Sequence, residues 1–239
     1  MIDSAQAYAS SQDALTKQYQ AITQNLANAS TVGYKRIVCE VEAAGASPDG
    51  SPAESGSVSA KLSLDLTQGH LVQTGRALDL ALNGPGFFVL ETPQGNLHTR
   101  HGVFQVNAQG QLVDAAGRTV AGESGPLVLP RGASESLSVG ADGRIFAGKQ
   151  EVGKLRIVEF EKTQRLEPTG QCAYRARSGA APAAAAKTTV QQGYQEASNV
   201  NVVDELVGLI TVSRLYEANA KSIHSQDERY KNLIQVAMG

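Results

Sequence analysis

Apolar residues near the end of the chain recur in alternating steps of four and three. The series runs through Val202, Leu206, Leu209, Ser213, Tyr216, Ala220, Ile223, Asp227, Tyr230, Ile234 and Ala237. Every position except Ser213 and Asp227 is apolar, which predicts a long amphipathic helix with a heptad seam for another helix. Asn201 precedes the series in the position of an N-cap. At about 1.5 Å per residue, residues 202–237 would span roughly 54 Å, so we expect part of the helix to project.

A similar series near the start of the chain offers this seam a partner. It runs through Ala5, Tyr8, Gln12, Leu15, Tyr19, Ile22, Leu26 and Ala29, all apolar except Gln12. We therefore expect residues 1–36 and 193–239 to form two helical halves of one domain. The other faces of the first helix carry Ser, Gln, Thr and Asn, which suit burial against neighbouring protein. Two interpretations stay open: a helical hairpin packed on the chain's own core, or helices that contact other molecules.

The middle of the chain has the pattern of a β protein. Short runs with period-two alternation, such as LDLAL, GFFVL and RIFAG, are separated by turn signals, and Asp142-Gly143 is a two-residue hairpin signal. This predicts an antiparallel β body over residues 59–192, built as a sandwich or a barrel-like sheet. Residues 37–58 are rich in Gly, Ser and Pro towards their end and are interpreted as a linker. The expected fold class is α+β.

Composition narrows the classes of function. The chain has 239 residues, a hydrophobic fraction of 41% and a net charge of −2, which gives no electrostatic footprint for nucleic acid or anionic membrane. It has no Trp, and we expect neither a transmembrane span nor a cleavable secretory signal. Cys39 and Cys172 could form a disulfide or remain two buried free thiols.

Two patterns suggest chemistry at first reading. Residues 148–155, GKQEVGKL, have the spacing of a phosphate loop, but Leu155 stands where a Ser or Thr is required and a strand-like run follows. His98 and His101 suggest a metal pair, yet residues three apart in an extended segment point to opposite faces. The sequence therefore predicts no enzyme, no metal site and no cofactor.

Four stretches together resemble one family. ITQNLANASTVGYKR (residues 22–36) is similar to the N-terminal signature of bacterial flagellar axial proteins, and residues 66–90 and 99–122 resemble its central motifs. Residues 193–221 resemble its C-terminal signature. The nearest members are the proximal and distal basal-body rod proteins, related to the hook protein, although Val32 stands where the family commonly has Thr. The residues that carry the two terminal signatures are Asn25, Leu26, Ala27, Asn28, Gly33, Tyr34, Lys35, Ser198, Asn199, Val200 and Asn201.

The resemblance implies a structural subunit of the periplasm-spanning flagellar rod, which self-assembles into a helical tube and transmits motor torque to the hook. It implies that the terminal helices pair as a coiled-coil-like inner domain. It also implies that the partners are other copies, other rod proteins, the hook and the flagellar export apparatus, with no nucleic acid or small-molecule substrate. The expected interface residues are Leu15, Tyr19, Ile22, Leu26, Val202, Leu206, Leu209, Tyr216, Ile223, Tyr230 and Ile234.

An alternative from another class is a secreted β-rich binding module with a coiled-coil stalk. Such a module would need a conventional signal and an exposed aromatic platform, whereas aromatic residues make up 5% of the chain. The motifs do not separate the proximal from the distal rod position, and they leave the copy number open.

Overall fold

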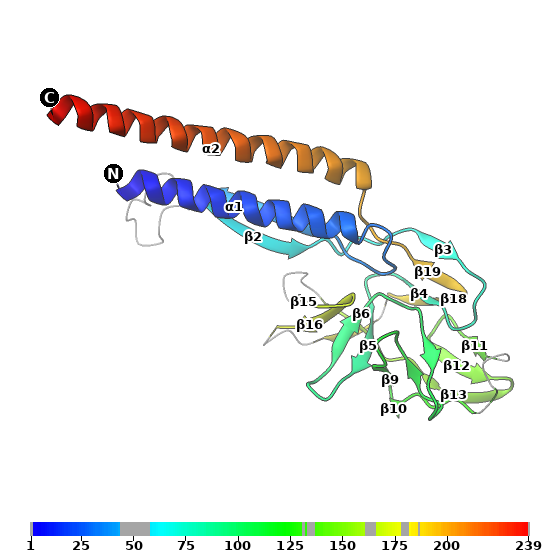
Figure 1. Ribbon diagram of the computed structural model, residues 1–239. Helices are drawn as coiled ribbons and strands as arrows, with labels where there is room; N and C mark the ends of the chain where they lie inside the picture. Colours follow the sequence, from blue (N-terminus) through cyan, green and yellow to red (C-terminus); the bar gives the residue numbers. More distant parts are fainter. Residues whose placement is uncertain are drawn as a thin grey trace. The chain divides into compact units, whose positions relative to one another are not determined.

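The computed structural model (Figure 1) describes residues 2–43, 58–130, 132, 137–160, 166–177, 182–185 and 187–238. The chain divides into two compact units. Residues 1–27, 37–63 and 201–239 form the first, which we call the helical unit, and residues 28–36 and 64–200 form the second, which we call the β unit. Each unit is therefore assembled from segments that are far apart in the sequence.

The helical unit contains two helices and a pair of strands. Helix α1 comprises Ile2–Ala27 and helix α2 comprises Val202–Met238. The Asn219 side-chain amide donates a hydrogen bond of 3.0 Å to Gln12 Oε1, and Gly208 lies beside Ile22. Because a later residue of α2 meets an earlier residue of α1, the two helices run antiparallel (Figure 1).

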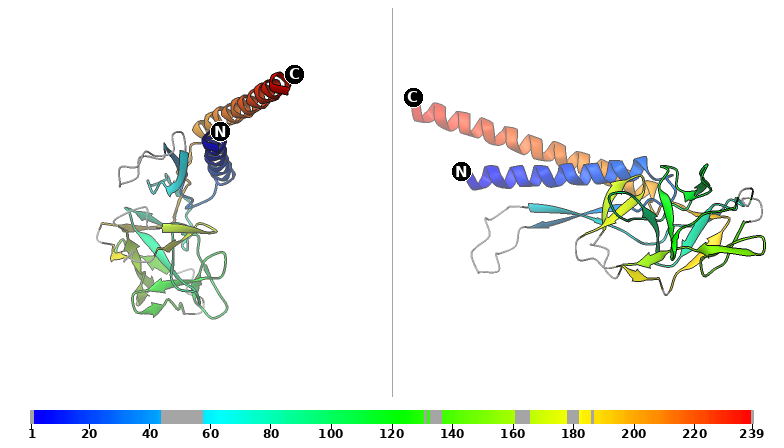
Figure 2. Two further views of the ribbon diagram at one scale, coloured as in Figure 1. Left: turned by 90° about the vertical axis from the view of Figure 1, so that its left-hand side faces the viewer. Right: turned by 90° about the horizontal axis from the view of Figure 1, so that it is seen from below.

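Strands β1 (Ile37–Ala43) and β2 (Val58–Leu64) pair in a two-stranded sheet. Strand β1 contacts α1, as two further views show (Figure 2). Residues 37–43 were expected to belong to a linker, but IVCEVEA is rich in β-branched residues and has apolar positions that α1 can cover. The Gly, Ser and Pro-rich part of that expected linker, residues 44–57, lies outside the described residues.

The β unit is built from short strands. They are β3 (Leu71–Gln73), β4 (Leu80–Asn83), β5 (Phe87–Glu91), β6 (Leu97–Thr99), β7 (Gln105–Val106), β8 (Leu112–Val113), β9 (Thr119–Gly122), β10 (Gly125–Pro126), β11 (Leu137–Val139), β12 (Arg144–Ala147), β13 (Gln150–Lys154), β14 (Ile157–Glu159), β15 (Leu166–Gly170), β16 (Ala173–Ala176), β17 (Ala183–Ala184), β18 (Thr189–Gln192) and β19 (Tyr194–Glu196).

The strands of the β unit pair antiparallel, which confirms the α+β class. The largest sheet has the order β15-β16-β6-β5-β9-β8-β7. In the described part of the chain no pairing joins β15 to β7, so the sheet is open and the barrel-like alternative is wrong. The remaining strands form separate sheets: β11, β12 and β13 make one, β18 pairs with β4, and β19 pairs with β3.

The core of the β unit is apolar and aromatic. Phe88 and Phe104 are fully buried and meet edge to face, with ring centroids 5.2 Å apart. The other large members are Leu80, Leu82, Leu90, Leu97, Leu112, Val120, Leu127, Leu129, Leu137, Ile145, Leu155 and Val190. A hairpin forms at Asp142-Gly143 as expected, since it connects the antiparallel strands β11 and β12. Its turn is longer than the two-residue signal implied: residues 140–143 separate the strands, and of Asp142 and Gly143 only the glycine has a positive φ, +85°.

Both cysteines are free and half-buried, and burial raises the pKa of each thiol. Cys39 lies in the helical unit and Cys172 in the β unit. Among the described helices, none is both long enough and apolar enough to cross a membrane.

Candidate subunit interface

The first turns of α2 expose a group of large apolar side chains. Val203 is 67% exposed, Val207 59% and Ile210 56%, and the spacing of four and three places them on one side of the helix. Val202 and Leu206 flank them and are also exposed. We call these five residues the apolar face of α2. Val212 and Glu205, which are buried, lie on the opposite side of the helix together with Gly208, which meets α1.

The heptad seam expected from the sequence lies between these two sides of α2. Val202 and Leu206 are exposed at its start, whereas Leu209 and Ile223 are half-buried. A heptad repeat has 3.5 residues per turn and a straight α-helix has 3.6, so the series drifts by about 20° per heptad. The seam therefore starts beside the apolar face and turns towards α1 further along the helix.

The remaining expected interface residues also divide into exposed side chains and side chains that are buried or half-buried. Tyr216 and Ile234 are exposed, and the side chain of Tyr230 lies outside the described residues. On α1, Ile22 is buried and Tyr19 is 46% exposed. Leu15 and Leu26 are half-buried. The side chains expected at one interface thus divide between contacts inside the helical unit and exposed positions.

Sequence reasoning missed Val203, Val207 and Ile210. They form a second apolar stripe one position away from the heptad series, and this stripe is visible in the sequence. The heptad series continues for longer, and sustained periodicity is the stronger signal for helix pairing. A short stripe confined to the first turns carries less weight by that criterion, although each of its three side chains is more than half exposed.

Asn201 caps α2 as expected. The backbone N–H of Val203 donates a hydrogen bond of 3.1 Å to Asn201 Oδ1, and the N–H of Glu205 donates to the Asn201 carbonyl oxygen at 3.1 Å. Just before it, the N–H of Val200 donates to the Ser198 hydroxyl oxygen at 3.3 Å. The C-terminal signature thus fixes the point at which the chain becomes helical.

A buried ion-pair cluster joins the N-terminal and C-terminal signatures inside the β unit. Lys35 Nζ lies 2.6 Å from Glu196 Oε1, and Arg100 Nη1 lies 3.2 Å from Glu196 Oε2. All three side chains are 1% exposed. Burial lowers the pKa of both Lys35 and Arg100, and the Glu196 carboxylate opposes this lowering. We call Lys35, Arg100 and Glu196 the ion-pair cluster.

Backbone groups satisfy the rest of the ion-pair cluster. Lys35 Nζ also donates to the Thr67 carbonyl oxygen at 2.6 Å, and Arg100 Nη2 donates to the Gly84 carbonyl oxygen at 2.6 Å. The N–H of Gly69 donates to Glu196 Oε1 at 3.0 Å. Most polar atoms of the cluster are therefore hydrogen-bonded as well as paired, which a buried charge requires, although the buried Arg100 Nε has no hydrogen-bond partner among the residues that the structure describes.

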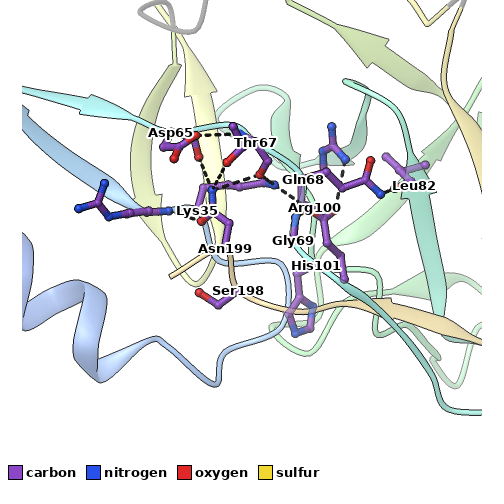
Figure 3. Close-up of polar contacts among 12 residues, drawn as sticks. Lys35, Asp65, Thr67, Gln68, Gly69, Leu82, Arg100, His101, Ser198 and Asn199 are labelled. Carbon is purple, nitrogen blue, oxygen red and sulfur yellow. Dashed lines mark hydrogen bonds and ion pairs between the residues drawn. The ribbon is translucent and has the colours of Figure 1, made fainter. Parts of the chain in front are cut away.

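Asn199 holds the same junction through its side-chain amide. Its Oδ1 accepts a hydrogen bond of 2.7 Å from the N–H of Arg36, and its Nδ2 donates to the carbonyl oxygens of Asp65 and Thr67 (Figure 3). An amide both donates and accepts, so one side chain serves a segment on each side.

Gly33 is required by its surroundings in the N-terminal signature. Its φ is +68°, and a Cβ at this position would lie 2.5 Å from the backbone nitrogen of His101. Its N–H donates to the Glu196 carbonyl oxygen at 2.7 Å. The neighbouring Tyr34 is 7% exposed. The Gly-Tyr-Lys triplet therefore anchors the N-terminal segment in the β unit.

The preceding signature residues end α1. Ala27 is its last residue, and the N–H of Thr31 then donates to the Asn28 carbonyl oxygen at 3.0 Å in a turn. Asn25, inside the helix, is 1% exposed. Its Nδ2 donates to the Ile37 carbonyl oxygen, and its Oδ1 accepts from the Ile37 N–H, both at 2.8 Å.

The phosphate-loop spacing and the histidine pair both fall on residues that belong to the structure of the β unit. Residues 150–154 of the apparent phosphate loop form strand β13. His98 is buried in β6, where its ring meets Phe160 at 4.8 Å between centroids. Burial lowers the pKa of both His98 and His101. Within the described residues, no group of three or more His, Cys, Asp or Glu side chains could hold a metal ion.

A surface pocket of the β unit is lined by polar side chains, and its carboxylate already has hydrogen-bond and ion-pair partners. It is lined by His101, Asp114, Arg118 and Cys172 among others. Asp114 Oδ2 lies 2.6 Å from Arg118 Nη2, and Asp114 Oδ1 accepts backbone hydrogen bonds from Ala116 and Arg118. The carboxylate therefore holds a turn, and the raised pKa of the Cys172 thiol disfavours a thiolate nucleophile.

Two family models match the chain. "Flagellar hook protein FlgE/F/G D1 domain" matches residues 81–147, and "Flagellar basal body rod FlgEFG protein C-terminal" matches residues 191–236. The second range includes Glu196, Asn199 and the apolar face of α2.

Curated relatives match almost the whole chain. The flagellar basal-body rod protein FlgG of Buchnera aphidicola subsp. Schizaphis graminum is 32% identical, over 94% of this chain and 95% of the relative. The rod protein FlgF of Caulobacter vibrioides is 31% identical over 95% and 94%, and FlgG of Bacillus subtilis is 30% identical over 90% and 91%. The chain belongs to the flagellar basal-body rod protein family. The resemblance predicted from the four motifs is thereby confirmed.

This rod protein is a structural subunit located in the flagellar basal body, as the sequence motifs implied. Its relatives are structural proteins and not known enzymes. They do not favour the alternative of a secreted binding module. Both FlgG and FlgF are among them at similar identity, so they do not separate the two rod positions.

Proposed function

We propose that this rod protein polymerises through the apolar face of α2, which is buried against neighbouring subunits in the assembled rod. The proposal rests on one observation, the exposure of Val203, Val207 and Ile210 on the side of α2 opposite α1. Monomeric proteins rarely expose a continuous group of large apolar side chains without a binding role. Burying one such side chain contributes on the order of 1.5–3 kcal/mol.

In this proposal α1 and α2 pair as a coiled-coil-like inner domain, and the β unit forms the outer part of the rod. A head-to-tail contact that does not close on itself generates a helical tube. Torque passes to the hook because each subunit contacts several neighbours through the same helices. The partners are other copies, other rod proteins and the hook. The flagellar export apparatus delivers the chain to the growing tip.

The heptad-seam residues have two roles within this proposal. Leu209 and Ile223, with Leu15, Ile22 and Leu26 of α1, stabilise the pairing of the two helices, because they are half-buried or buried. Val202, Leu206, Tyr216 and Ile234 contact neighbouring subunits, because they are exposed in the single chain. Tyr19, which is exposed on α1, joins this second group.

The test places one negative charge on the apolar face. Val207→Asp and Ile210→Asp are introduced separately into a strain that lacks the wild-type protein. The unfolding free energy of the purified chain should change little, because both side chains are exposed before assembly. In the rod the carboxylate would lie among apolar neighbours, which costs several kcal/mol. We expect non-motile cells whose basal bodies lack the variant protein.

Ser222→Asp is the matched control, since it adds the same charge to an exposed polar position of α2 about three turns beyond Ile210. It should support motility. Motile cells with Val207→Asp and Ile210→Asp protein in their basal bodies would refute the proposed interface. Loss of the folded state in the purified variants would show that these residues stabilise the chain itself.

A further inference from the structure

We infer that Glu196 closes the β unit: until residues 189–199 dock, β3 and β4 lack their strand partners and Lys35 and Arg100 lack their counter-ion. The inference rests on the proposed function in one respect, which is delivery by the export apparatus. A chain that is delivered unfolded must not complete its fold before delivery. The closure itself is a property of the single chain and can be measured without assembly.

The contacts of the cluster join distant parts of the sequence. Glu196 contacts Lys35 across 161 residues, Gly69 across 127 and Arg100 across 96. The adjacent strands follow the same plan, since β18 pairs with β4 and β19 pairs with β3. One C-terminal segment therefore completes pairings for an N-terminal residue, two central strands and a central arginine.

The C-terminal segment packs closely against the rest of the β unit, so its position is tightly restricted. A Cβ at Gly69 would lie 2.0 Å from the Ala197 carbonyl oxygen, so the docked backbone lies directly against Gly69. The N–H of Ala197 donates to the His70 carbonyl oxygen at 2.8 Å. Gln195 Nε2 donates to Asp79 Oδ2 at 2.7 Å. Backbone and side-chain contacts thus fix Glu196 at one register relative to Lys35 and Arg100.

Closure of the β unit depends on the Glu196 carboxylate, because this group neutralises the buried charges of Lys35 and Arg100. Without Glu196, burial of Lys35 would leave an ammonium group that donates to the Thr67 carbonyl oxygen but has no opposite charge in the cluster. Arg100 would retain the Gly84 carbonyl oxygen and the Phe87 ring, 4.9 Å from its guanidinium carbon. The charge of Arg100 also lowers the pKa of Lys35. Removing one partner from a buried ion pair is strongly destabilising, so both cations should stay solvated until Glu196 arrives.

These contacts imply that the parts of the β unit fold in a definite order. The pairing of β12 with β13 uses neighbouring segments alone, so it can form before residues 189–199 are present. Strand β11 and its turn, by contrast, also form hydrogen bonds with Gln192 and Val190. The surfaces that receive β18 and β19 cannot close at that stage. A chain whose C-terminal segment is still extended therefore stays open at the junction of its two signatures, and docking of that segment completes the β unit.

Hydrogen–deuterium exchange of the purified full chain tests the inference. Glu196→Gln keeps the size of the side chain and an acceptor for Gly69, and it removes the charge. We expect amides of residues 33–36, 71–73 and 80–83 to exchange about a hundredfold faster than in the wild type. Amides of β12 and β13 should keep their protection, because their pairing does not use the C-terminal segment.

A second variant separates charge from packing. Lys35→Met in the Glu196→Gln background removes one uncompensated cation and should slow the exchange of residues 71–73 and 80–83 by about tenfold. Glu167→Gln, which breaks the exposed Arg177 pair, is the control and should change nothing. The inference is overturned if Glu196→Gln exchanges like the wild type, if β12 and β13 accelerate equally, or if Lys35→Met adds to the damage.

Failure of this inference is distinct from failure of the proposed function. Exchange is measured on the dilute chain, whereas the apolar face of α2 is tested by incorporation into basal bodies. Normal exchange in Glu196→Gln would leave the proposed interface standing. Motile cells carrying Val207→Asp would leave the closing role of Glu196 standing.

Discussion

Gly208 of α2 lies against Ile22 of α1, so that a Cβ built on the glycine would be 3.3 Å from Ile22 Cδ1. A methyl group requires a small shift of that flexible end, whereas a larger side chain requires the helices to separate. Alanine is favoured over glycine inside a helix by about 1 kcal/mol. We therefore expect Gly208→Ala to leave the unfolding free energy unchanged or slightly raised, as measured by urea denaturation.

Gly208→Leu should have the opposite effect at the same position. Its side chain cannot fit beside Ile22, so we expect α1 to lose protection in hydrogen exchange while the β unit keeps its own. If Gly208→Leu is as well protected as Gly208→Ala, the helices do not pack at this point in solution.

Gly69→Ala should destabilise the β unit strongly. The added Cβ would lie 2.0 Å from the Ala197 carbonyl oxygen, which is backbone and cannot rotate away. We expect a loss of at least about 2 kcal/mol in the free energy of unfolding, since the docked segment must move. Gly75→Ala is the control, because its Cβ would meet nothing within 4 Å and its φ of +74° adds strain alone, about 1 kcal/mol. Equal losses in the two variants would contradict the close contact.

His98 should make the β unit sensitive to mild acid. It is 4% exposed, and burial, aided by the charge of Arg156, lowers its pKa from 6.5 to about 4. Between these values the unfolded chain binds more protons, so the unfolding free energy falls as pH drops from 6.5 to 4. The full effect of this group is roughly 3 kcal/mol.

His98→Leu should remove this contribution. Carboxylates titrate in both proteins, so the difference between wild type and variant isolates His98 when unfolding is measured across that pH range. The exposed His224→Gln variant serves as the control and should follow the wild type. A His98→Leu protein with the same pH dependence as the wild type would show that His98 does not titrate in this window.

Asn201→Ala should weaken the start of α2. The substitution removes the acceptor for the Val203 N–H, which typically costs about 1 kcal/mol. We expect faster amide exchange over the first turn of α2 and unchanged exchange at its middle. Asn201→Asp keeps an acceptor at the helix N-terminus and should restore protection; if it does not, the side chain acts in another way.

Local patterns in the sequence predicted the local structure well. Asn201 was recognised as an N-cap because capping depends on a residue and the few that follow it. The Asp142-Gly143 hairpin was found for the same reason. The heptad seam predicted the long helix, but its positions divide between half-buried and exposed ones, because seam and helix differ in period. The stripe at Val203, Val207 and Ile210 was therefore missed.

The ion-pair cluster could not be predicted in this way. Lys35 and Glu196 belong to different motifs, 161 residues apart, and neither has a local pattern that marks it for burial. An isolated Lys or Glu in a sequence is most simply interpreted as solvated. Only the three-dimensional pairing of β18 with β4 and β19 with β3 brings the charges together. The split into several sheets was missed for a similar reason, because strand order depends on contacts between distant segments.

Asn25 replaces a neighbouring strand for one residue of β1. Its side-chain amide meets both the N–H and the carbonyl oxygen of Ile37 at 2.8 Å, as a peptide group would. The base of the β1–β2 pair is thereby fixed to α1, and the strands cannot slide by a residue without breaking both bonds. The sequence of residues 44–57 can therefore change in length or composition without moving this anchoring point.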